Sequence, residues 1–278
     1  MGDIHGCYTE YLTLESMIHR QAQEQGRRAF IVSVGDLIDR GPDSAKVVSH
    51  FLRGEQNGTH TAILGNHEVM LLQVLQQFAP ENFGETYCAW PLGLPTLKDV
   101  YLQGGEWVGE DDFQAFVHRT CQMWLAQGGR ETLLSLEQDP FRPASWRLPL
   151  HWLSYLVTLP LYWENETTVA THALVDRYSL QFLRRAEQKR QPMHQRSREL
   201  FLDAQEKALW NRKMLRQRPD DLREHISGHT PVKSFRYHTQ AHALQIDTGC
   251  VYGQTLSAYC AELKASLHVP ALRKYTIS

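Results

Sequence analysis

Three short polar segments near the start of the chain carry side chains that bind hard or borderline metal ions. The segments are Gly2-Asp3-Ile4-His5-Gly6, Gly35-Asp36-Leu37-Ile38-Asp39-Arg40-Gly41 and Gly65-Asn66-His67-Glu68, and two later histidines stand in Thr171-His172-Ala173 and Gly228-His229-Thr230-Pro231. The candidate ligands are Asp3, His5, Asp36, Asn66, His172 and His229. Carboxylate, imidazole and amide ligands without a thiolate suit Mn²⁺, Fe or Zn²⁺ better than a soft metal. Six ligands are too many for one tetrahedral ion, and Asp36 can bridge, so we expect two ions roughly 3.5–4 Å apart.

Such a pair of ions can activate a bridging water and clamp phosphoryl oxygens, which predicts hydrolysis of a phosphoester without a covalent intermediate. Arg40 can present its planar fork to phosphate oxygens. His67 follows the ligand Asn66 and is the candidate general acid for the leaving alkoxide. Asp39 is a plausible partner that fixes the tautomer of His67 and favours its imidazolium form.

The elements that must position these side chains alternate between strands and helices. Apolar runs over residues 30–34 and 61–64 read as short buried strands, each ending at a glycine before a ligand loop. Residues 8–24 and 68–78 have helical patterns that begin next to these loops. This alternation predicts an α/β protein with a parallel or mixed sheet, in which ligands bind beyond the carboxyl ends of the strands.

The rest of the chain is expected to complete one domain over residues 1–278. Residues 80–150 read as a helical insertion beside the site, with a helix near 113–125 and aromatic residues that could line an insertion core or stack on a base (Tyr87, Trp90, Tyr101, Trp107). A hairpin is predicted over 159–171, and strands near 225–227, 243–246 and 255–259. Residues 179–218 look mainly helical, and within them 184–218 hold eleven Lys and Arg against four Asp and Glu. A solvated helical face is the preferred reading of that segment, and a positive rim that steers phosphorylated substrates is the other.

Composition narrows the class of protein. The 278 residues carry a net charge of −2, which does not favour a general binder of polyanions, so no nucleic-acid partner is expected. No apolar run approaches the roughly 20 residues needed to cross a bilayer, so no membrane partner is expected either. The five cysteines are scattered without a Cys-x-x-Cys pair, and no signal peptide is recognised, which together predict reduced thiols and a cytoplasmic protein.

The order of these motifs resembles the metal-dependent phosphoesterases of the calcineurin-like superfamily, and within it the bacterial phosphoprotein-phosphatase-like branch. The family pattern is GDxHG, GDxxDRG, GNHE, a histidine after an apolar strand, and GH, and all five stand here between residues 2 and 229. Three further segments are similar to that branch: Trp124 to Leu133, Leu209-Trp210-Asn211-Arg212, and Ile246-Asp247-Thr248-Gly249.

The resemblance implies a four-layer αββα sandwich and two bound divalent ions, Mn²⁺ first, with Fe or Zn²⁺ as alternatives. It implies that Asp3, His5 and Asp36 hold one ion, and that Asp36, Asn66, His172 and His229 hold the other. It also implies that Arg40 and Arg212 bind phosphate. The expected activity is a serine/threonine phosphoprotein phosphatase; the alternatives are a hydrolase of dinucleoside polyphosphates such as diadenosine tetraphosphate, and a scaffold that has lost turnover.

The chain departs from the family pattern at its first motif. The family has an apolar strand before its first Gly-Asp, whereas only Met1 precedes Gly2 here. We therefore expect a shortened chain or a weakly held first ion, with Asp3 and His5 on a fraying terminus. A second departure is Leu174, where the family commonly has glycine.

Overall fold

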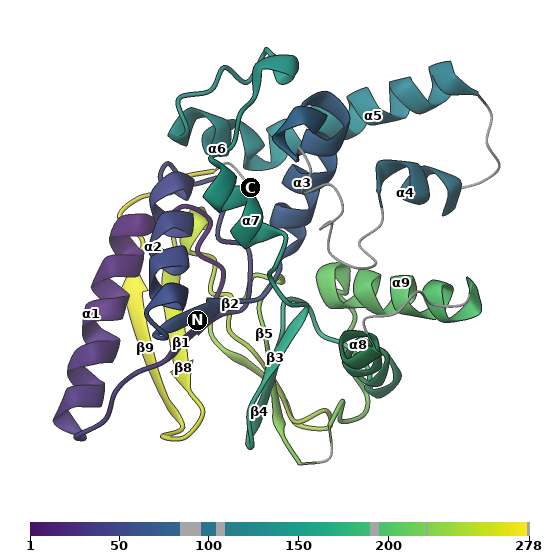
Figure 1. The fold of residues 1–278 in the computed structure, drawn as a ribbon. Helices are drawn as coiled ribbons and strands as arrows, with labels where there is room; N and C mark the ends of the chain where they lie inside the picture. The colour runs from purple at the N-terminus through teal and green to yellow at the C-terminus, as the bar shows by residue number, and fades with distance from the viewer. Residues whose placement is uncertain (84–95, 104–108, 190–194, 221, 277–278) are drawn as a thin grey trace.

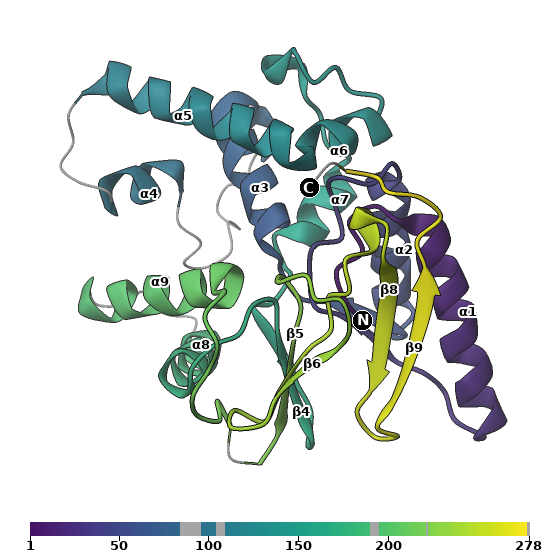
Figure 2. The ribbon, with the colours of Figure 1, turned by 180° about the vertical axis from the view of Figure 1, so that it is seen from behind.

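The computed structural model describes residues 1–83, 96–103, 109–189, 195–220 and 222–276. One outer layer consists of α1 (Tyr8–Glu24) and α2 (Ser44–Gln56), which lie side by side in Figures 1 and 2. Beneath them lie two strand pairs: β1 (Ile31–Ser33) runs parallel to β2 (His60–Ala62), and β8 (Thr255–Cys260) runs antiparallel to β9 (Ala265–Pro270). Apolar side chains of the helices and of these strands form the largest hydrophobic core.

The second sheet has five strands in the order β3-β4-β5-β7-β6. Their bounds are β3 Tyr162–Glu164, β4 Thr168–Thr171, β5 Glu224–Ser227, β6 Arg236–His238 and β7 Ala243–Gln245. The strands β4, β5 and β7 are mutually parallel, and antiparallel strands close both edges. Val169 of β4 packs on α8 (Arg177–Lys189) and α9 (Gln195–Trp210), which form the other outer layer.

A third apolar cluster lies between the two strand layers. It joins Val34 and Ile63, which follow β1 and β2, to Ala170, Ile226 and Leu244 of the five-stranded sheet. The order of layers is therefore helix, strand, strand, helix, and the predicted α/β sandwich is confirmed. The predicted hairpin and the strands near 225, 243 and 255 are also present, whereas β6 and β9 were not predicted.

The described residues between 80 and 150 are mainly helical, as predicted. After α3 (Asn66–Phe78) and a 3₁₀ turn (Pro80–Asn82) come α4 (Leu97–Gln103), α5 (Glu110–Trp124), a π-helical turn (Leu125–Gly129), α6 (Arg130–Ser135), a second 3₁₀ turn (Pro143–Ser145) and α7 (Leu150–Leu156). In both ribbon views α4 and α5 extend beyond the sheets, above α9 (Figures 1 and 2). Trp124 and Trp146 nevertheless belong to the main core, so the later part of the segment is built into the sandwich.

The prediction that residues 179–218 are mainly helical is confirmed for the described part of that segment, which holds α8 and α9; residues 211–218 are not helical. The prediction of a frayed amino terminus is wrong. The Met1 amine donates to the carbonyl of Val32 (2.7 Å), the Val34 N–H donates to Met1 O (3.0 Å), and the Gly2 N–H donates to Ser257 O (2.9 Å). The first two residues thus lie between β1 and β8 and carry Asp3 and His5 into the buried interior.

Candidate metal centre

The ligand loops meet because β1 and β2 are parallel and in register, so the segments after them leave the same edge of the sheet. The loops are tightly bent: His5, Asp36, Asp39, Arg40 and His229 all have positive φ angles between 46° and 70°. Such backbone is costly for residues with a Cβ and persists where the surroundings hold it in place, often at functional sites. A Cβ on Gly65 would lie 2.2 Å from Asp36 Oδ1, so only glycine fits there.

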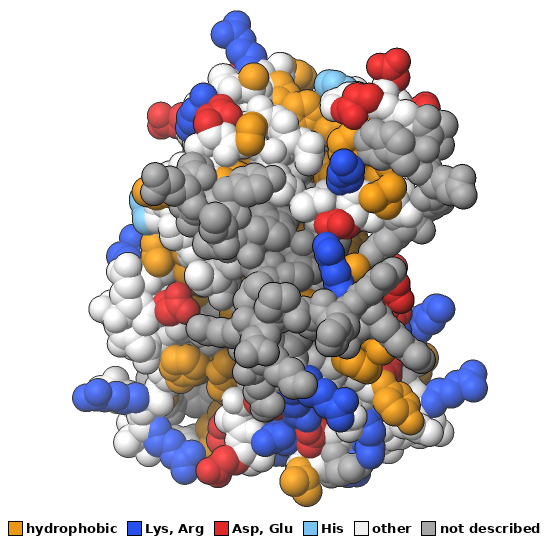
Figure 3. Space-filling view, turned by 45° about the vertical axis from the view of Figure 1, so that its right-hand side comes forward, with side chains coloured by type: hydrophobic (Ala, Val, Ile, Leu, Met, Phe, Trp, Pro, Cys, Tyr) orange, Lys and Arg blue, Asp and Glu red, His pale blue; other side chains and the backbone are white. Residues whose placement is uncertain are grey.

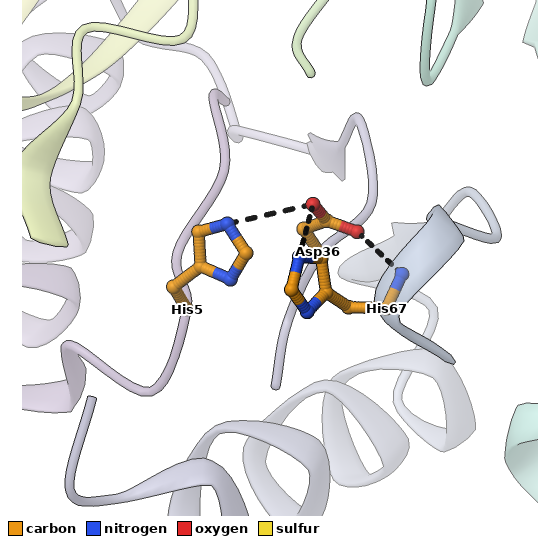
Figure 4. A group of neighbouring side chains, drawn as sticks. All are labelled: His5, Asp36 and His67. Atoms are coloured by element: carbon orange, nitrogen blue, oxygen red, sulfur yellow. Dashed lines mark hydrogen bonds and ion pairs between the residues drawn. The ribbon is translucent and has the colours of Figure 1, made fainter. Parts of the chain in front are cut away.

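Asp36 is the centre of the arrangement. Its Oδ2 lies 3.4 Å from His5 Nε2 and 4.0 Å from His67 Nε2, while its Oδ1 lies 3.5 Å from His172 Nε2 and accepts the His67 backbone N–H (3.1 Å). Figure 4 shows His5 linked to this carboxylate through its ring, and His67 linked to it through both its ring and its backbone nitrogen. The two oxygens of Asp36 therefore face two different groups of candidate ligands.

The first group contains Asn66, His172 and His229. Its side chains make more close polar contacts than their N–H groups can satisfy as hydrogen bonds. His172 Nδ1 must donate to the Val34 carbonyl (2.8 Å), and burial lowers the pKa of His172, so its Nε2 carries only a lone pair. That nitrogen faces Asn66 Oδ1, another acceptor, at 2.8 Å. His229 Nδ1 lies 3.0 Å from the same oxygen and 3.2 Å from His172 Nε2, and burial lowers the pKa of His229 to about 3. Converging buried acceptors of this kind fit a cation.

The second group contains Asp3, His5 and Asp36. His5 Nδ1 donates to the Ile38 carbonyl (2.8 Å), so its bare Nε2 points towards Asp36, and Arg40 Nη1 donates to that nitrogen at 2.6 Å. The positively charged Arg40 guanidinium therefore contacts the nitrogen that could bind a metal ion. Burial, together with the charges of Asp247 and Asp36, raises the pKa of Asp3 well above its usual range. Three carboxyl groups gathered without solvent also fit a cation.

His67 belongs to a separate hydrogen-bonded chain. Its Nδ1 lies 2.7 Å from Asp39 Oδ2, so the ring presents Nε2 towards Asp36. Asp39 is completely buried and also accepts the Trp124 indole N–H (2.9 Å) and the Thr132 hydroxyl (2.6 Å). Trp124 and Thr132 thus fix the carboxylate that orients His67. The family-like segment around Trp124 was noticed in the sequence, but nothing in its spacing shows this contact.

Two more residues near the centre were not predicted as site residues. Asp247 is buried, and that burial raises its pKa to about 6. Glu68 is buried as well, and its carboxylate accepts four backbone N–H groups from the loops that carry Asp36 and Asn66. The only sequence signal for them is their membership of the Asp-Thr-Gly and Asn-His-Glu segments.

Arg212 lies at the exposed side of the centre. Its side chain is exposed, and after burial its charge is among the causes that lower the pKa of His172 and His229. The neighbouring Trp210 ring meets His229 edge-on, with ring centroids 6.2 Å apart. All ten predicted site residues are therefore described and lie around one centre, while their roles remain predictions.

Some basic side chains of α8 and α9 form ion pairs with acidic neighbours. Arg184 pairs with Glu164 and Asp220, and Lys207 pairs with Asp176 and Asp203. Figure 3 shows blue and red side chains interspersed over this face. These pairs favour a solvated helical face over a continuous positive rim. None of the described helices is long and apolar enough to cross a membrane.

Comparisons with known proteins show the family to which the chain belongs. A model of the family described as calcineurin-like phosphoesterase matches residues 1–253. Serine/threonine-protein phosphatase 1 of Salmonella typhimurium is 28% identical over 92% of this chain and 88% of its own length. A symmetrical bis(5'-nucleosyl)-tetraphosphatase of Wigglesworthia glossinidia brevipalpis is 39% identical over 26% of this chain, which spans only 24% of that relative's length. The solved structure of a cold-active protein-tyrosine phosphatase from a psychrophilic Shewanella has 10% identity and a TM-score of 0.48, and it covers 89% of this chain and 70% of that one.

Proposed function

The chain belongs to the calcineurin-like phosphoesterase family, and on that premise we propose that it is a metal-dependent phosphatase that hydrolyses phosphoserine or phosphothreonine in proteins. The observation that carries the proposal is the position of Asp36, whose two oxygens face two separate groups of metal-binding side chains. The His67–Asp39 pair lies directly beside it. A bridging carboxylate next to a proton donor is the arrangement that in-line hydrolysis of a phosphoester needs.

The proposed ligand sets follow the two groups. Asp3, His5 and Asp36 would hold one divalent ion, and Asp36, Asn66, His172 and His229 would hold the other. When bound, such ions polarise phosphoryl oxygens and make water acidic enough to act as a nucleophile near neutral pH. Mn²⁺ is the proposed metal, because oxygen and imidazole ligands without thiolate suit it; Fe and Zn²⁺ are the alternatives.

The protein's own side chains would bind the phosphate and move the proton. Arg40 and Arg212 carry the cationic donors at this centre, and each can hold two phosphate oxygens through its planar fork. His67 keeps its Nδ1 hydrogen on Asp39, so the atom that can give a proton to the leaving oxygen is Nε2. Asp39 stabilises the ring when both nitrogens carry hydrogen.

The choice of a phosphoprotein substrate is supported by a relative that aligns over 92% of the chain, a serine/threonine-protein phosphatase. A cytoplasmic location is proposed with it, from the scattered cysteines without a Cys-x-x-Cys pair.

A pocket beside the centre favours the second candidate, hydrolysis of dinucleoside polyphosphates. It has a volume of about 340 Å³ and is mostly apolar, and residues from α3, α4, α5 and α9 line it, among them Met70, Leu97, Phe116 and Trp210. Pockets of this size bind small ligands. The Trp210 side chain is 41% exposed and could stack on a base. Of the other aromatics considered for that role, Tyr101 packs on Phe113 and Phe116, and Tyr87, Trp90 and Trp107 lie outside the described residues.

The test compares Mn²⁺-dependent phosphate release from a phosphothreonine peptide with Mn²⁺-dependent formation of mononucleotides (two ADP, or ATP and AMP) from diadenosine tetraphosphate. A higher kcat/KM on the peptide supports the proposal, and a higher value on the dinucleotide supports the second candidate. Trp210→Ala should then lower kcat/KM on the dinucleotide only. Failure of both substrates, with metal bound, would contradict both activities and favour a scaffold without turnover.

A further inference from the structure

A second cluster of metal-binding side chains lies outside the catalytic centre, between α1, α2 and β2. Glu15 of α1 accepts hydrogen bonds from His50 Nε2 of α2 (3.0 Å) and His60 Nε2 of β2 (3.0 Å), both at its Oε1. His19, one helical turn after Glu15, places its Nε2 3.7 Å from the same oxygen. None of these four residues belongs to the six candidate ligands of the catalytic centre.

We propose that this cluster binds a Zn²⁺ ion through Glu15, His50 and His60, with His19 or water as the fourth ligand. One ligand atom from each of the first three residues lies within 4.8 Å of the others. Zinc bonds of 2.0–2.1 Å in tetrahedral geometry separate neighbouring ligand atoms by about 3.3 Å. The two 3.0 Å separations are close to that value, so small side-chain rotations would admit the ion.

The hydrogen-bond partners of the second nitrogen in each histidine ring are also suited to zinc. His50 Nδ1 lies 3.2 Å from the Tyr8 hydroxyl, and His60 Nδ1 lies 2.8 Å from the Thr59 hydroxyl. A zinc-bound imidazole must carry its hydrogen on the far nitrogen, and a hydroxyl can accept that hydrogen as readily as it can donate its own. Both rings can therefore change tautomer and keep their partner at Nδ1, while the Tyr11 hydroxyl, which lies 2.8 Å from His60 Nε2, would give up that contact to the ion.

The partial exposure of three of these side chains gives the ion access to the cluster from solvent. The His60 side chain is buried, those of Glu15 and His50 are 13% and 20% exposed, and that of His19 is 47% exposed. Two or three imidazoles with one carboxylate favour Zn²⁺ over Mg²⁺ or Ca²⁺, which prefer sets of oxygen ligands.

The position of the cluster suggests what the ion would do. α1 directly follows the loop with Asp3 and His5, α2 follows the loop with Asp36, and β2 precedes the loop with Asn66. In Figure 1, α1 and α2 run side by side with β2 beneath them. One ion bound to all three elements would fasten the scaffolds of the three catalytic loops to each other, and so raise thermal stability without taking part in the reaction.

The test measures zinc per chain, after gel filtration of zinc-loaded protein, in wild type, Glu15→Gln, His50→Gln and the control His151→Gln, which changes an exposed histidine. We expect Glu15→Gln and His50→Gln to bind one zinc ion fewer than wild type and the control. Their zinc affinity at this site should be lowered about 100-fold or more. Added zinc should raise Tm in wild type and in the control by more than in the two cluster variants. Equal zinc content in all four proteins would overturn the proposal.

A second measurement does not depend on how well the cluster variants fold. Asp36→Asn weakens the catalytic centre and leaves the cluster intact, so this variant loaded with one equivalent of zinc should hold the ion at Glu15, His50 and His60. X-ray absorption at the zinc edge should then show nitrogen and oxygen neighbours with at least two imidazoles. A zinc ion surrounded by water oxygens alone, or no retained zinc, would refute the site.

Discussion

Glu68 is the side chain whose replacement best tests how the loop with Asp36 is held. Its buried carboxylate accepts the Leu37 and Ile38 N–H groups at one oxygen (2.8 and 3.3 Å), and those of Asp36 and Gly65 at the other (3.0 and 2.9 Å). In Glu68→Gln one oxygen becomes an NH₂ group, which cannot accept a hydrogen bond. Two backbone N–H groups therefore lose their acceptor, whichever way the amide turns.

The magnitude follows from these two unpaired donors. Leaving a buried donor without a partner costs about 1–3 kcal/mol, so the substitution should cost about 2–6 kcal/mol. If the loop keeps its shape, the whole cost appears in the free energy of unfolding, and Tm falls by about 10 °C, at roughly 2–4 °C per kcal/mol for a domain of similar size. If the loop moves instead, Asp36 and Asp39 move with it, and metal affinity and kcat fall in place of Tm.

The assays are thermal unfolding followed by circular dichroism, urea unfolding, and kcat with saturating Mn²⁺. Glu24→Gln, at an exposed position near the end of α1, is the matched control and should behave like wild type. A Glu68→Gln variant with wild-type Tm and wild-type kcat would show that the four hydrogen bonds do not hold the loop, and the reasoning would fail.

Four further changes test the centre and its surroundings. His67→Ala should lower turnover by about 10²–10⁴-fold on substrates with poor leaving groups and by less on p-nitrophenyl phosphate, and equal losses would exclude a general acid. Asp36→Asn should remove Mn²⁺ from the catalytic centre together with most activity; an unchanged Mn²⁺ content by elemental analysis would exclude the bridge. Thr132→Val deletes the hydroxyl on Asp39 and should lower kcat about 10-fold at unchanged KM. Burial lowers the pKa of His225 to about 3, below the ordinary 6.5, so stability should fall as pH drops from 6.5 towards 3, by about 4 kcal/mol at most. His225→Gln should weaken this dependence of stability on pH in acid unfolding. An unchanged dependence would show that His225 is not its cause.

The sequence was sufficient to select the candidate ligands that meet at one centre, but not the groups that support them. Asp36 and Asn66 each follow a short apolar strand, and that local pattern predicts both the strand and the edge at which its loop ends. Trp124 and Thr132 reach Asp39 from a segment more than eighty residues away, and no local period marks such a contact. The strand β9 was missed although its burial alternates regularly, with Ala265, Leu267 and Val269 on the less exposed face.

The contacts that were not predictable explain how strained loops can form a rigid centre. His5, Asp36, Asp39 and Arg40 all have positive φ angles, and residues with a Cβ adopt this conformation at a cost of about 1–3 kcal/mol each. At the catalytic end, the buried carboxylates of Glu68 and Asp39 offset this cost through hydrogen bonds from backbone, indole and hydroxyl donors. At the other end, Glu15 joins the elements that carry the same loops. Because the loops are held from both ends, exchanging a metal ion at the centre should change the charge there without requiring the backbone to rearrange.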